Sequence, residues 1–515
     1  MTFAERYLRT CRWLLAVCTV GLFSVAADGQ ELEDRVTEHV LDNGMKFLLV
    51  ERHETPVFSA YIIFKAGSVD EPAAQSGIAH MFEHMAFKGT TTIATKDYAK
   101  EKPLLDEVNR IGRELTDEQL KGENADPEKV EKLLEELAEA AKKQSELIVK
   151  DELDEIYSRN GADMLNAGTG ADTTTYYVSL PSNRLELWAS LESDRLINPV
   201  LREFYSERDV VMEERRLRYE TSPFGKLMES FRAAAFVAHP YGDPTIGWSS
   251  DIAGLTVEDA ESFRTRYYVP HNAVCAIVGD IDTEATIELV GNYFGRIPKG
   301  EPARDRITDE PAQEGERRTD VQFDAQPQLL IGYHKPTLPH FDDYVFDVVD
   351  SILSRGRSSR LYESLIKEQQ VAVAVETWQG FPGARFDNLF VFSATPRHPH
   401  TAQQLEDAIY AQIEKLVQDP PSDKEMQKVR NQLRADFVRD LDSNSGLASK
   451  LAYFEAVGAG WRYAVTHREM IEKVTREDVV RVVNQYLTKA NRTVATLVPV
   501  EEKPPPPVAE QEGAT

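Results

Sequence analysis

The segment His80-Met81-Phe82-Glu83-His84 (HMFEH) is the most informative part of this chain, because its spacing indicates a metal site on a helix. Residues four apart share one face of a helix, so a helix here would direct both imidazoles at one metal ion, with Glu83 leaning over the same place. Neutral imidazole suits Zn²⁺, and a carboxylate that is not a ligand can take a proton from metal-bound water. The order H-x-x-E-H reverses H-E-x-x-H. We interpret it as a metal site rather than a packed histidine pair, because Glu83 would be costly to bury among the apolar residues around it.

A catalytic zinc usually has three protein ligands and one water, so a further ligand is expected downstream. The segment 206–219 has the period of a helix, and Glu207 and Glu214 lie two helical turns apart within it, so they face the same way. Glu214 is the predicted third ligand, and Glu207 is predicted to brace a histidine from behind. Glu213 lies about 100° off that face and is expected to be solvated.

Length and charge narrow the class of protein. The chain has 515 residues, which is enough for two large domains or three to four small ones. Its 42% hydrophobic and 28% charged content is ordinary for a soluble globular protein. The net charge of −27 argues against non-specific nucleic-acid binding. It fits either an acidic cavity that attracts basic ligands or a solvated acidic surface.

Residues 1–27 have the pattern of a secretory signal peptide. Arg6, Arg9 and Arg12 precede the apolar run from Trp13 to Ala26, and small residues follow. The alternative is an uncleaved anchor, but the run is short for a membrane span, and no later segment approaches the ~18 apolar residues that a span needs. We therefore expect a chain secreted or exported to a periplasm-like space, with no stable membrane span after cleavage of the signal.

Cleavage of the signal peptide would also change the cysteine content. Cys11 and Cys18 would leave with the signal peptide, so the mature chain would keep only Cys275. It could then form no internal disulfide.

The residues before HMFEH read as two strands and a turn. Asn43-Gly44 predicts the turn, the alternation after it predicts one strand, and Val57 to Phe64 is rich in β-branched and aromatic residues. The helix that carries HMFEH is expected over about 74–87. A strand followed by this helix would place the metal ligands on rigid elements.

The segment from about 91 to 158 is charged and helical by period, and it predicts a helical hairpin inserted into the first domain. Asp126-Pro127 predicts the start of its second helix, with Asp126 as the cap and Pro127 at the first helical position. The sequence leaves open whether the hairpin gates or docks something, or is a solvated spacer.

The stretch Met164 to Leu180 (MLNAGTGADTTTYYVSL) predicts a strand over Thr173 to Leu180, preceded by a segment with few bulky side chains. Asn166 and Ala167 in that segment would suit an exposed sheet edge, to which an extended peptide could be added as a further strand.

An internal repeat divides the chain in two. Thr256, Asp259, Tyr267 and Asn272 recur, without gaps, 219 residues later as Thr475, Asp478, Tyr486 and Asn491. In both copies a helix leads into an apolar strand, so the chain is predicted to contain two copies of one α+β unit. The predicted boundaries are listed here: an N-terminal metal-bearing domain at 36–297, a linker at 298–318, a homologous C-terminal domain without a metal site at 319–500, and a disordered tail at 501–515.

These phrases together resemble the pitrilysin/insulinase family of inverted-zincin metallopeptidases, in particular its smaller two-domain members, which include the mitochondrial processing peptidases and bacterial homologues. The resemblance covers nearly all of the mature chain, through LDNGMKFLLVERHETPVFSAYIIFKAGS, HMFEHMAFKGT, NAGTGADTTTYY, ERDVVMEE, HPYGDPTIG and YYVPHNAVCAIVGDID. It implies an α+β fold in which two homologous domains, each a mostly antiparallel sheet packed with helices, form a clam-like chamber.

The resemblance also implies roles for particular residues. His80, His84 and Glu214 would bind one Zn²⁺, Glu83 would be the general base, and Glu207 would support the site. The strand containing Asn166 and Ala167 would receive the peptide substrate. The chain is thus expected to be a secreted zinc endopeptidase.

The chain departs from the family pattern in its second copy. Active members carry an Arg and, seven residues on, a Tyr that help to hold the substrate carbonyl, whereas the matching positions here are Ile366 and Val373. Neither side chain can donate a hydrogen bond. The resemblance therefore implies a partner, a related zinc-less subunit that supplies the Arg/Tyr pair in a heterodimer. The alternative function is a zinc-binding assembly or binding subunit with little turnover, and if the chain works alone, Arg360 or Lys367 would have to hold the carbonyl.

Overall fold

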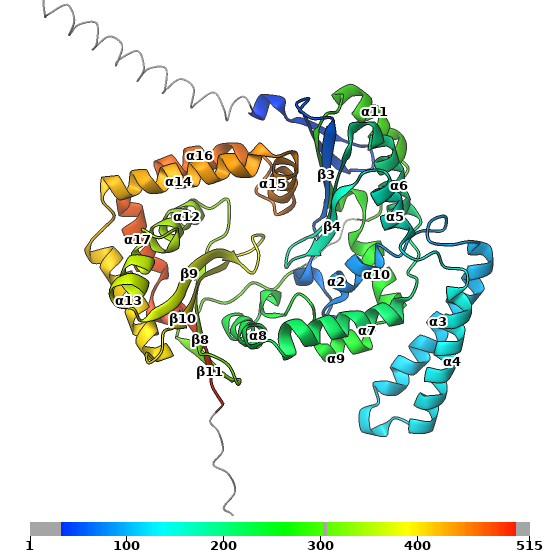
Figure 1. Cartoon of the computed structure of the whole chain (residues 1–515), viewed down its shortest axis with the longest axis horizontal. Helices are drawn as coiled ribbons and strands as arrows, with labels where there is room; N and C mark the ends of the chain where they lie inside the picture. Colours follow the sequence, from blue (N-terminus) through cyan, green and yellow to red (C-terminus); the bar gives the residue numbers. More distant parts are fainter. Residues whose placement is uncertain (1–31, 302–305, 501–515) are drawn as a thin grey trace, which may run out of the picture.

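The computed structural model describes residues 32–301 and 306–500. The predicted signal peptide (1–27), the predicted tail (501–515) and four residues of the predicted linker (302–305) lie outside the described residues. Figure 1 shows two halves, each built on its own sheet, with the insertion hairpin at the outer side of the first half. The expected α+β class with two sheets and many helices is confirmed.

The described residues of the first half form one sheet and a set of α-helices that includes α2 to α11. Its strands are β1 (Thr37–Val40), β2 (Lys46–Glu51), β3 (Val57–Phe64), β4 (Asp163–Thr169), β5 (Thr174–Pro181) and β6 (Ala273–Gly279). Its α-helices are α2 (Ile78–Met85), α3 (Tyr98–Gln119), α4 (Pro127–Ser145), α5 (Glu152–Arg159), α6 (Leu185–Ile197), α7 (Phe204–Arg215), α8 (Pro223–Ala235), α9 (Ser249–Gly254), α10 (Val257–Tyr267) and α11 (Thr283–Phe294). Its short turns are η1 (Ser68–Asp70), η2 (Gly122–Asn124), η3 (Ser182–Arg184), the π-helical η4 (Arg216–Glu220), η5 (Pro240–Gly242) and η6 (Pro270–Asn272).

The strands of the first sheet lie in the order β1-β2-β6-β3-β5-β4. Only the β2–β6 pair is parallel. The expected turn at Asn43-Gly44 is present, but it joins β2 to β1, a strand that the sequence did not predict because its residues are polar and half exposed. The segment with few bulky side chains before β5, which was predicted to suit an exposed sheet edge, is strand β4, and it lies at the edge of the sheet. Its outer backbone groups have no neighbouring strand in the described chain.

Helix α2 is shorter than the sequence predicted. It begins after Gly77, whose φ of +91° is unfavourable for residues with a side chain, and Ala74 also has a positive φ. The chain therefore turns sharply through the first residues of the predicted helix, 74–87. Its apolar face, with Met81, Phe82 and Met85, is buried in the core of the first half.

The second half repeats the plan with a smaller sheet. Its strands are β7 (Arg317–Gln322), β8 (Gln328–Lys335), β9 (Ala372–Phe381), β10 (Asn388–Pro396) and β11 (Arg492–Val498), in the order β7-β11-β8-β10-β9. Only β7–β11 is parallel. Its helices and turns are α12 (Phe341–Ser354), the π-helical η7 (Tyr362–Glu368), α13 (Ala402–Gln418), α14 (Asp423–Asp442), α15 (Asn444–Ala456), α16 (Tyr463–Lys473), α17 (Arg476–Tyr486) and η8 (Lys489–Asn491).

The sequence repeat corresponds to matching local structures. Thr256 and Asp259 form a reciprocal capping box at the start of α10, and Thr475 and Asp478 form the same box at the start of α17. At the other end of each helix, an asparagine side chain donates to the carbonyl of the last helical tyrosine, 2.9 Å away in the first copy and 2.8 Å in the second. The repeated residues thus fix where each helix begins and how it enters the following strand.

Each half lends one helix to the sheet of the other. Helix α8 packs on β7, β8 and β11, whereas α15 packs on β3 and β6. Gly332 in β8 leaves room for the ring of Phe231 from α8, because a Cβ there would come within 2.5 Å of that ring. Tyr61 in β3 shares a 2.7 Å hydrogen bond with Ser445 of α15. One core cluster accordingly contains residues from both sides of the predicted linker.

The insertion hairpin is fixed at its base by a buried ion pair. Arg202 binds Glu101 of α3 through two hydrogen bonds of 2.7 and 3.1 Å, and both side chains are almost fully buried. The same guanidinium donates to the carbonyls of Lys88 and Thr90, just after α2. The predicted Asp126 cap is confirmed, since its carboxylate accepts from the backbone N–H groups of Glu128 and Lys129. No helix within the described ranges is both long and apolar enough for a bilayer crossing.

We predict that Glu101→Ala destabilises the chain by about 3–5 kcal/mol, because it leaves the Arg202 guanidinium buried without its counter-ion. The measurement is the midpoint of urea unfolding. Glu114→Ala is the matched control, because Glu114 lies on the same helix in an exposed ion pair with Arg110 and should leave the midpoint unchanged. Equal midpoints for the two variants would contradict the anchoring role of Glu101.

Candidate metal centre

Helix α2 is held at its start by a carboxylate from the preceding loop. Both oxygens of Glu71 accept hydrogen bonds, from the backbone N–H groups of Gly77 and Ala79, each at 2.9 Å. These donors belong to the first turn, which has no partners within the helix. A Cβ on Gly77 would lie 2.5 Å from the carbonyl oxygen of Ile246, so glycine is required for this close approach. Burial raises the pKa of Glu71 well above its usual value.

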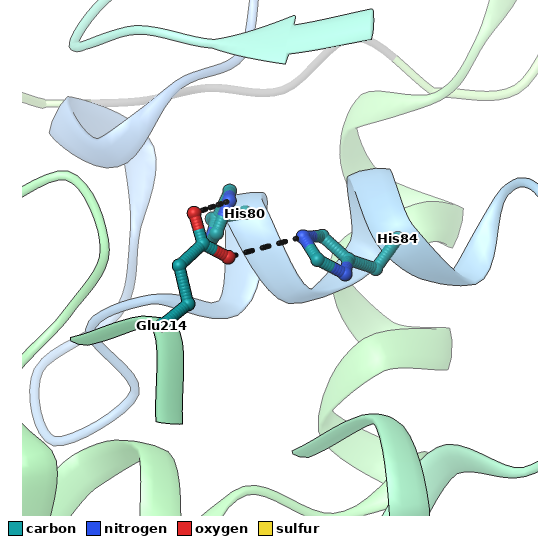
Figure 2. Close-up of side chains that lie close together, drawn as sticks. All are labelled: His80, His84 and Glu214. Carbon is teal, nitrogen blue, oxygen red and sulfur yellow. Dashed lines mark ion pairs between the residues drawn. The ribbon is translucent and has the colours of Figure 1, made fainter. Parts of the chain in front are cut away.

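The structure brings the three predicted metal ligands together. His80 and His84 project from α2 toward Glu214 of α7, whose two oxygens face one imidazole each (Figure 2). His80 Nε2 lies 3.8 Å from Glu214 Oε1, and His84 Nε2 lies 3.6 Å from Glu214 Oε2. Within the described chain, this is the one group of three or more His, Cys, Asp or Glu whose ligand atoms all lie within 4.8 Å of one another.

This geometry suits a zinc ion. Ligands at 2.0–2.2 Å around a tetrahedral ion lie roughly 3.4 Å apart, close to the separations seen here. Two imidazoles and one carboxylate are also a common donor set for catalytic zinc, with the fourth position left for water. Among protein groups, Arg218 already lies 2.8 Å from Glu214 Oε1, which shows that this carboxylate attracts a cation.

Glu207 lies behind His84, two helical turns before Glu214 on α7. Its Oε1 is 2.9 Å from His84 Nδ1, and Lys88 is 2.5 Å from its other oxygen. The hydrogen bond with His84 and the contact with Lys88 outweigh burial and lower the pKa of Glu207 to about 2. With a proton on Nδ1, His84 presents the lone pair of Nε2 toward Glu214. Glu213, by contrast, is exposed and paired with Arg216, as predicted.

The two histidines differ in their surroundings. Burial, together with the charges of His84 and Arg218, lowers the pKa of His80 to about 3, so its imidazole is neutral. Its Nδ1 is buried without a hydrogen-bond partner in the described chain. Burial also lowers the pKa of His84, but Glu207, Glu83 and Glu214 outweigh burial and raise it above its usual value.

Glu83 faces the same region without joining the group of ligands. Its Oε2 accepts a 2.6 Å hydrogen bond from the hydroxyl of Thr169, the last residue of β4. Burial raises the pKa of Glu83, and the Thr169 hydrogen bond opposes this only in part. Glu83 therefore connects the histidine helix to the edge strand, and its proton affinity is higher than that of an exposed glutamate.

Strand β4 carries Asn166 and Ala167, the predicted peptide-binding residues. The Asn166 side chain accepts a 2.8 Å hydrogen bond from the backbone N–H of Ala167. The pairing of β4 with β5 is interrupted between Asp163 and Asn166, and Met164 between them has a φ of +56°. This bulge leaves the second part of the strand, from Asn166 to Thr169, in regular register.

Sequence reasoning missed Glu71 and Thr169. Glu71 lies six residues before Gly77, outside the spacing of a capping box, so no local rule identifies it as a cap. Thr169 is within the quoted NAGTGADTTTYY phrase, but its contact with Glu83 joins residues that are 86 positions apart. The path of the loop before α2 reveals the Glu71 contact, and the packing of β4 against α2 reveals the Thr169 contact.

Four residues of the second half were identified from the sequence at or near the positions of the family's Arg/Tyr pair, namely Ile366, Val373, Arg360 and Lys367, and none of them replaces that pair. Ile366 packs against the second core, and Val373 is an exposed residue of β9. Arg360 is held by Glu425 through two hydrogen bonds of 2.9 Å, and Lys367 is paired with Glu363 at 2.8 Å. Both cations are thus engaged within the second half.

Comparison with known proteins places this geometry in a family. Residues 46–144 match the family described as insulinase (peptidase family M16), and residues 254–433 match the one described as peptidase M16 inactive domain. The zinc protease PqqE of Helicobacter pylori is 27% identical over 94% of this chain and 98% of its own length. A solved protease from Helicobacter pylori has a TM-score of 0.74 and 26% identity, covering 90% of this chain and 99% of that one.

A further solved structure, the first half of the periplasmic protease PqqL from Escherichia coli, covers 90% of this chain and 92% of its own, with a TM-score of 0.67. At 17% identity it supports the fold alone. The two family matches, the relative aligned along nearly its whole length and the shared two-sheet architecture agree with one another. The chain belongs to the insulinase family of peptidases, peptidase family M16.

Proposed function

We propose that this chain is a zinc-dependent endopeptidase that cleaves extended peptides or unfolded protein segments. The observation that carries the proposal is the convergence of His80, His84 and Glu214 beside a carboxylate, Glu83, that is not part of the ligand group. The similarity to chains named zinc proteases supports the same function.

The edge strand β4 would bind the substrate by adding it to the first sheet. Backbone hydrogen bonds along Asn166 and Ala167 would hold a peptide in extended form, without demanding a particular sequence. The Thr169 hydroxyl, at the end of this strand, binds Glu83. A peptide bond that continues along the strand would therefore reach the place where Glu83 and the histidines meet.

The chemistry would divide between the ion and the protein. Zinc, held by His80, His84 and Glu214, would act as a Lewis acid and lower the pKa of water to about 7. Glu83 would accept the proton of the attacking water and return it to the leaving amine. Its raised pKa favours both the uptake and the return of the proton near neutral pH. Glu207 would fix the orientation of His84.

We also propose that the chain is exported. Support comes from the basic and then apolar pattern of residues 1–27. The mature protein should begin near Asp28, which N-terminal sequencing or intact-mass measurement of the natural product checks. A mature chain that still starts at Met1 in the soluble fraction would contradict export by cleavage.

We predict that Glu83→Gln lowers kcat for a cleavable peptide by about 10²- to 10⁴-fold, with zinc still bound. The glutamine amide keeps the shape of the side chain but cannot accept the proton of the attacking water. Turnover and zinc content are measured on the same sample. Wild-type turnover in this variant would show that Glu83 is not the base.

Glu207→Gln is expected to affect zinc binding, in contrast to Glu83→Gln, which is expected to keep the zinc. Removing the carboxylate behind His84 should weaken zinc affinity 10- to 100-fold, measured by competition with a chelator. Glu213→Gln is the matched control, since Glu213 lies on the same helix but faces Arg216, and it should leave zinc affinity unchanged. Equal affinities in the two variants would exclude a role for Glu207 in the site.

A second candidate function is a zinc-binding subunit with weak turnover of its own. It is favoured by the apolar Ile366 and Val373, and by the engagement of Arg360 and Lys367 with nearby glutamates. Groups aimed at a developing oxyanion commonly contribute 10²- to 10³-fold in rate. A related zinc-less partner with an Arg/Tyr pair would supply them.

This partner requirement predicts that the purified chain cleaves peptides slowly and gains about 10²- to 10³-fold when such a homologue is added. More of the same chain should give no gain, because each copy presents Ile366 and Val373. The measurement is the rate of peptide cleavage at fixed zinc-bearing chain and increasing partner. Full activity in a demonstrably single-component sample would refute it.

A further inference from the structure

A cavity of about 540 Å³ opens directly beside the proposed reaction centre. Glu83 and His84 form one side of it, and residues 148–154, which lead out of the insertion hairpin, form the other. Its volume is within the range of pockets that bind small ligands, roughly 300–1,000 Å³. The insertion therefore reaches the reaction centre, although most of the hairpin lies well away from it (Figure 1).

The insertion side of the cavity is held in place by backbone contacts with the segment that follows α2. Lys96 N–H donates to Leu147 O at 2.8 Å, and Val149 N–H donates to Ala94 O at 3.1 Å. The Ala94 N–H in turn donates to the Glu152 carboxylate, 2.5 Å away. The wall is thus built from two paired segments and does not depend on a ligand for its position.

The walls combine apolar surface with unpaired negative charge. Phe87, Ile148 and Val149 offer apolar contacts. Asp151 and Asp154 line the same cavity, and no ion pair or hydrogen bond engages either carboxylate within the described chain. Burial and, to a smaller extent, the charge of Asp151 raise the pKa of Asp154, whereas the charge of Arg195 opposes this rise.

The positive groups of the cavity are largely compensated by other residues. Lys88 lies 2.5 Å from Glu207, and the Arg202 guanidinium is bound by Glu101. Lys150 is the remaining cation in the wall, and like Asp151 and Asp154 it is exposed at the surface. Glu203 adds a further carboxylate, 3.8 Å from Lys88. The uncompensated charge of the cavity is therefore negative.

We propose that this cavity receives a substrate side chain next to the scissile bond, and that Asp151 and Asp154 make it selective for lysine or arginine. The proposal rests on the proposed peptidase function. Glu83 belongs both to the cavity wall and to the contact with Thr169 at the end of β4, so a peptide on β4 reaches the reaction centre at the mouth of the cavity. The long methylene stem of lysine or arginine would lie along the apolar wall, with its charged end at the two aspartates.

The first test uses two series of fluorogenic peptides, one varied at the residue before the scissile bond and one at the residue after it. Within each series the varied residue is arginine, lysine, norleucine or glutamate, and the rest of the peptide is identical. The wild-type chain should cleave the basic peptides about 10- to 100-fold better than the norleucine peptide in kcat/KM, a preference that shrinks at high salt. Asp151→Asn with Asp154→Asn should abolish this preference by lowering kcat/KM for the basic peptides to the level of the norleucine peptide.

Two further variants make the test specific. Glu155→Gln is the matched control, because Glu155 is on the same helix as Asp154 but pairs with Arg159 outside the cavity, so it should retain the wild-type preference. Asp154→Lys should shift the preference toward the glutamate peptide. A wild-type chain without preference for basic residues, or a double variant that keeps it, would overturn the proposal.

A binding measurement separates this proposal from the proposed function. The zinc-loaded Glu83→Gln chain, with and without the two Asp→Asn changes, is titrated with labelled arginine and norleucine peptides, and binding is followed by fluorescence anisotropy. The arginine peptide should bind at least tenfold more tightly than the norleucine peptide, and the two Asp→Asn changes should remove this difference. That result supports the selective cavity even if the wild-type chain cleaves no peptide. In that case only the proposed peptidase function would fail. Equal binding of both peptides would overturn the selectivity.

Discussion

The charge balance between helices α2 and α7 is the constraint on which the site depends. Helix α7 directs two carboxylates at the histidines of α2, so that His84 is met at one ring nitrogen by Glu207 and at the other by Glu214. Partly buried carboxylates are costly unless cations compensate them. Lys88 compensates Glu207, whereas among the described Lys and Arg side chains only the exposed Arg218 pairs with Glu214. A divalent cation between Glu214 and the two imidazoles would complete this balance.

The position of α2 follows from the fold around it. Glu71 binds its first backbone N–H groups, its apolar face enters the first core, and Glu83 reaches across to β4. The first sheet is in turn covered on its other face by α15 from the second half, while α8 of the first half covers the second sheet. The reaction centre and the edge strand therefore rest on a framework to which both halves contribute, although all the proposed ligands come from the first.

Local rules predicted the parts of this site whose chemistry is encoded in spacing. Residues four apart on α2 and seven apart on α7 come together as their helical period requires, and the capping boxes at Thr256 and Thr475 mark the repeated helix. The start of α2 could not be predicted, because the positive φ of Gly77 goes with a close approach to the Ile246 carbonyl, far along the chain. The Thr169–Glu83 contact and the cavity shared by Glu83, Asp151 and Asp154 were missed for a related reason, since neither Thr169 nor the segment 151–154 carries a local sign that it lies near Glu83.

The insertion shows why spacing alone leaves function open. From the sequence, a charged helical hairpin was as consistent with a solvated spacer as with a role in gating or docking. The exposed ion pairs along α3 and α4, such as Lys102–Asp106 and Lys143–Glu139, are those of a solvated surface and contribute little to stability. The base of the hairpin differs, because Glu101 is buried against Arg202 and the segment after α4 is paired with residues 94–96. An insertion fixed in this way brings its last residues to a definite place beside Glu83, where their charge can act on whatever the edge strand presents.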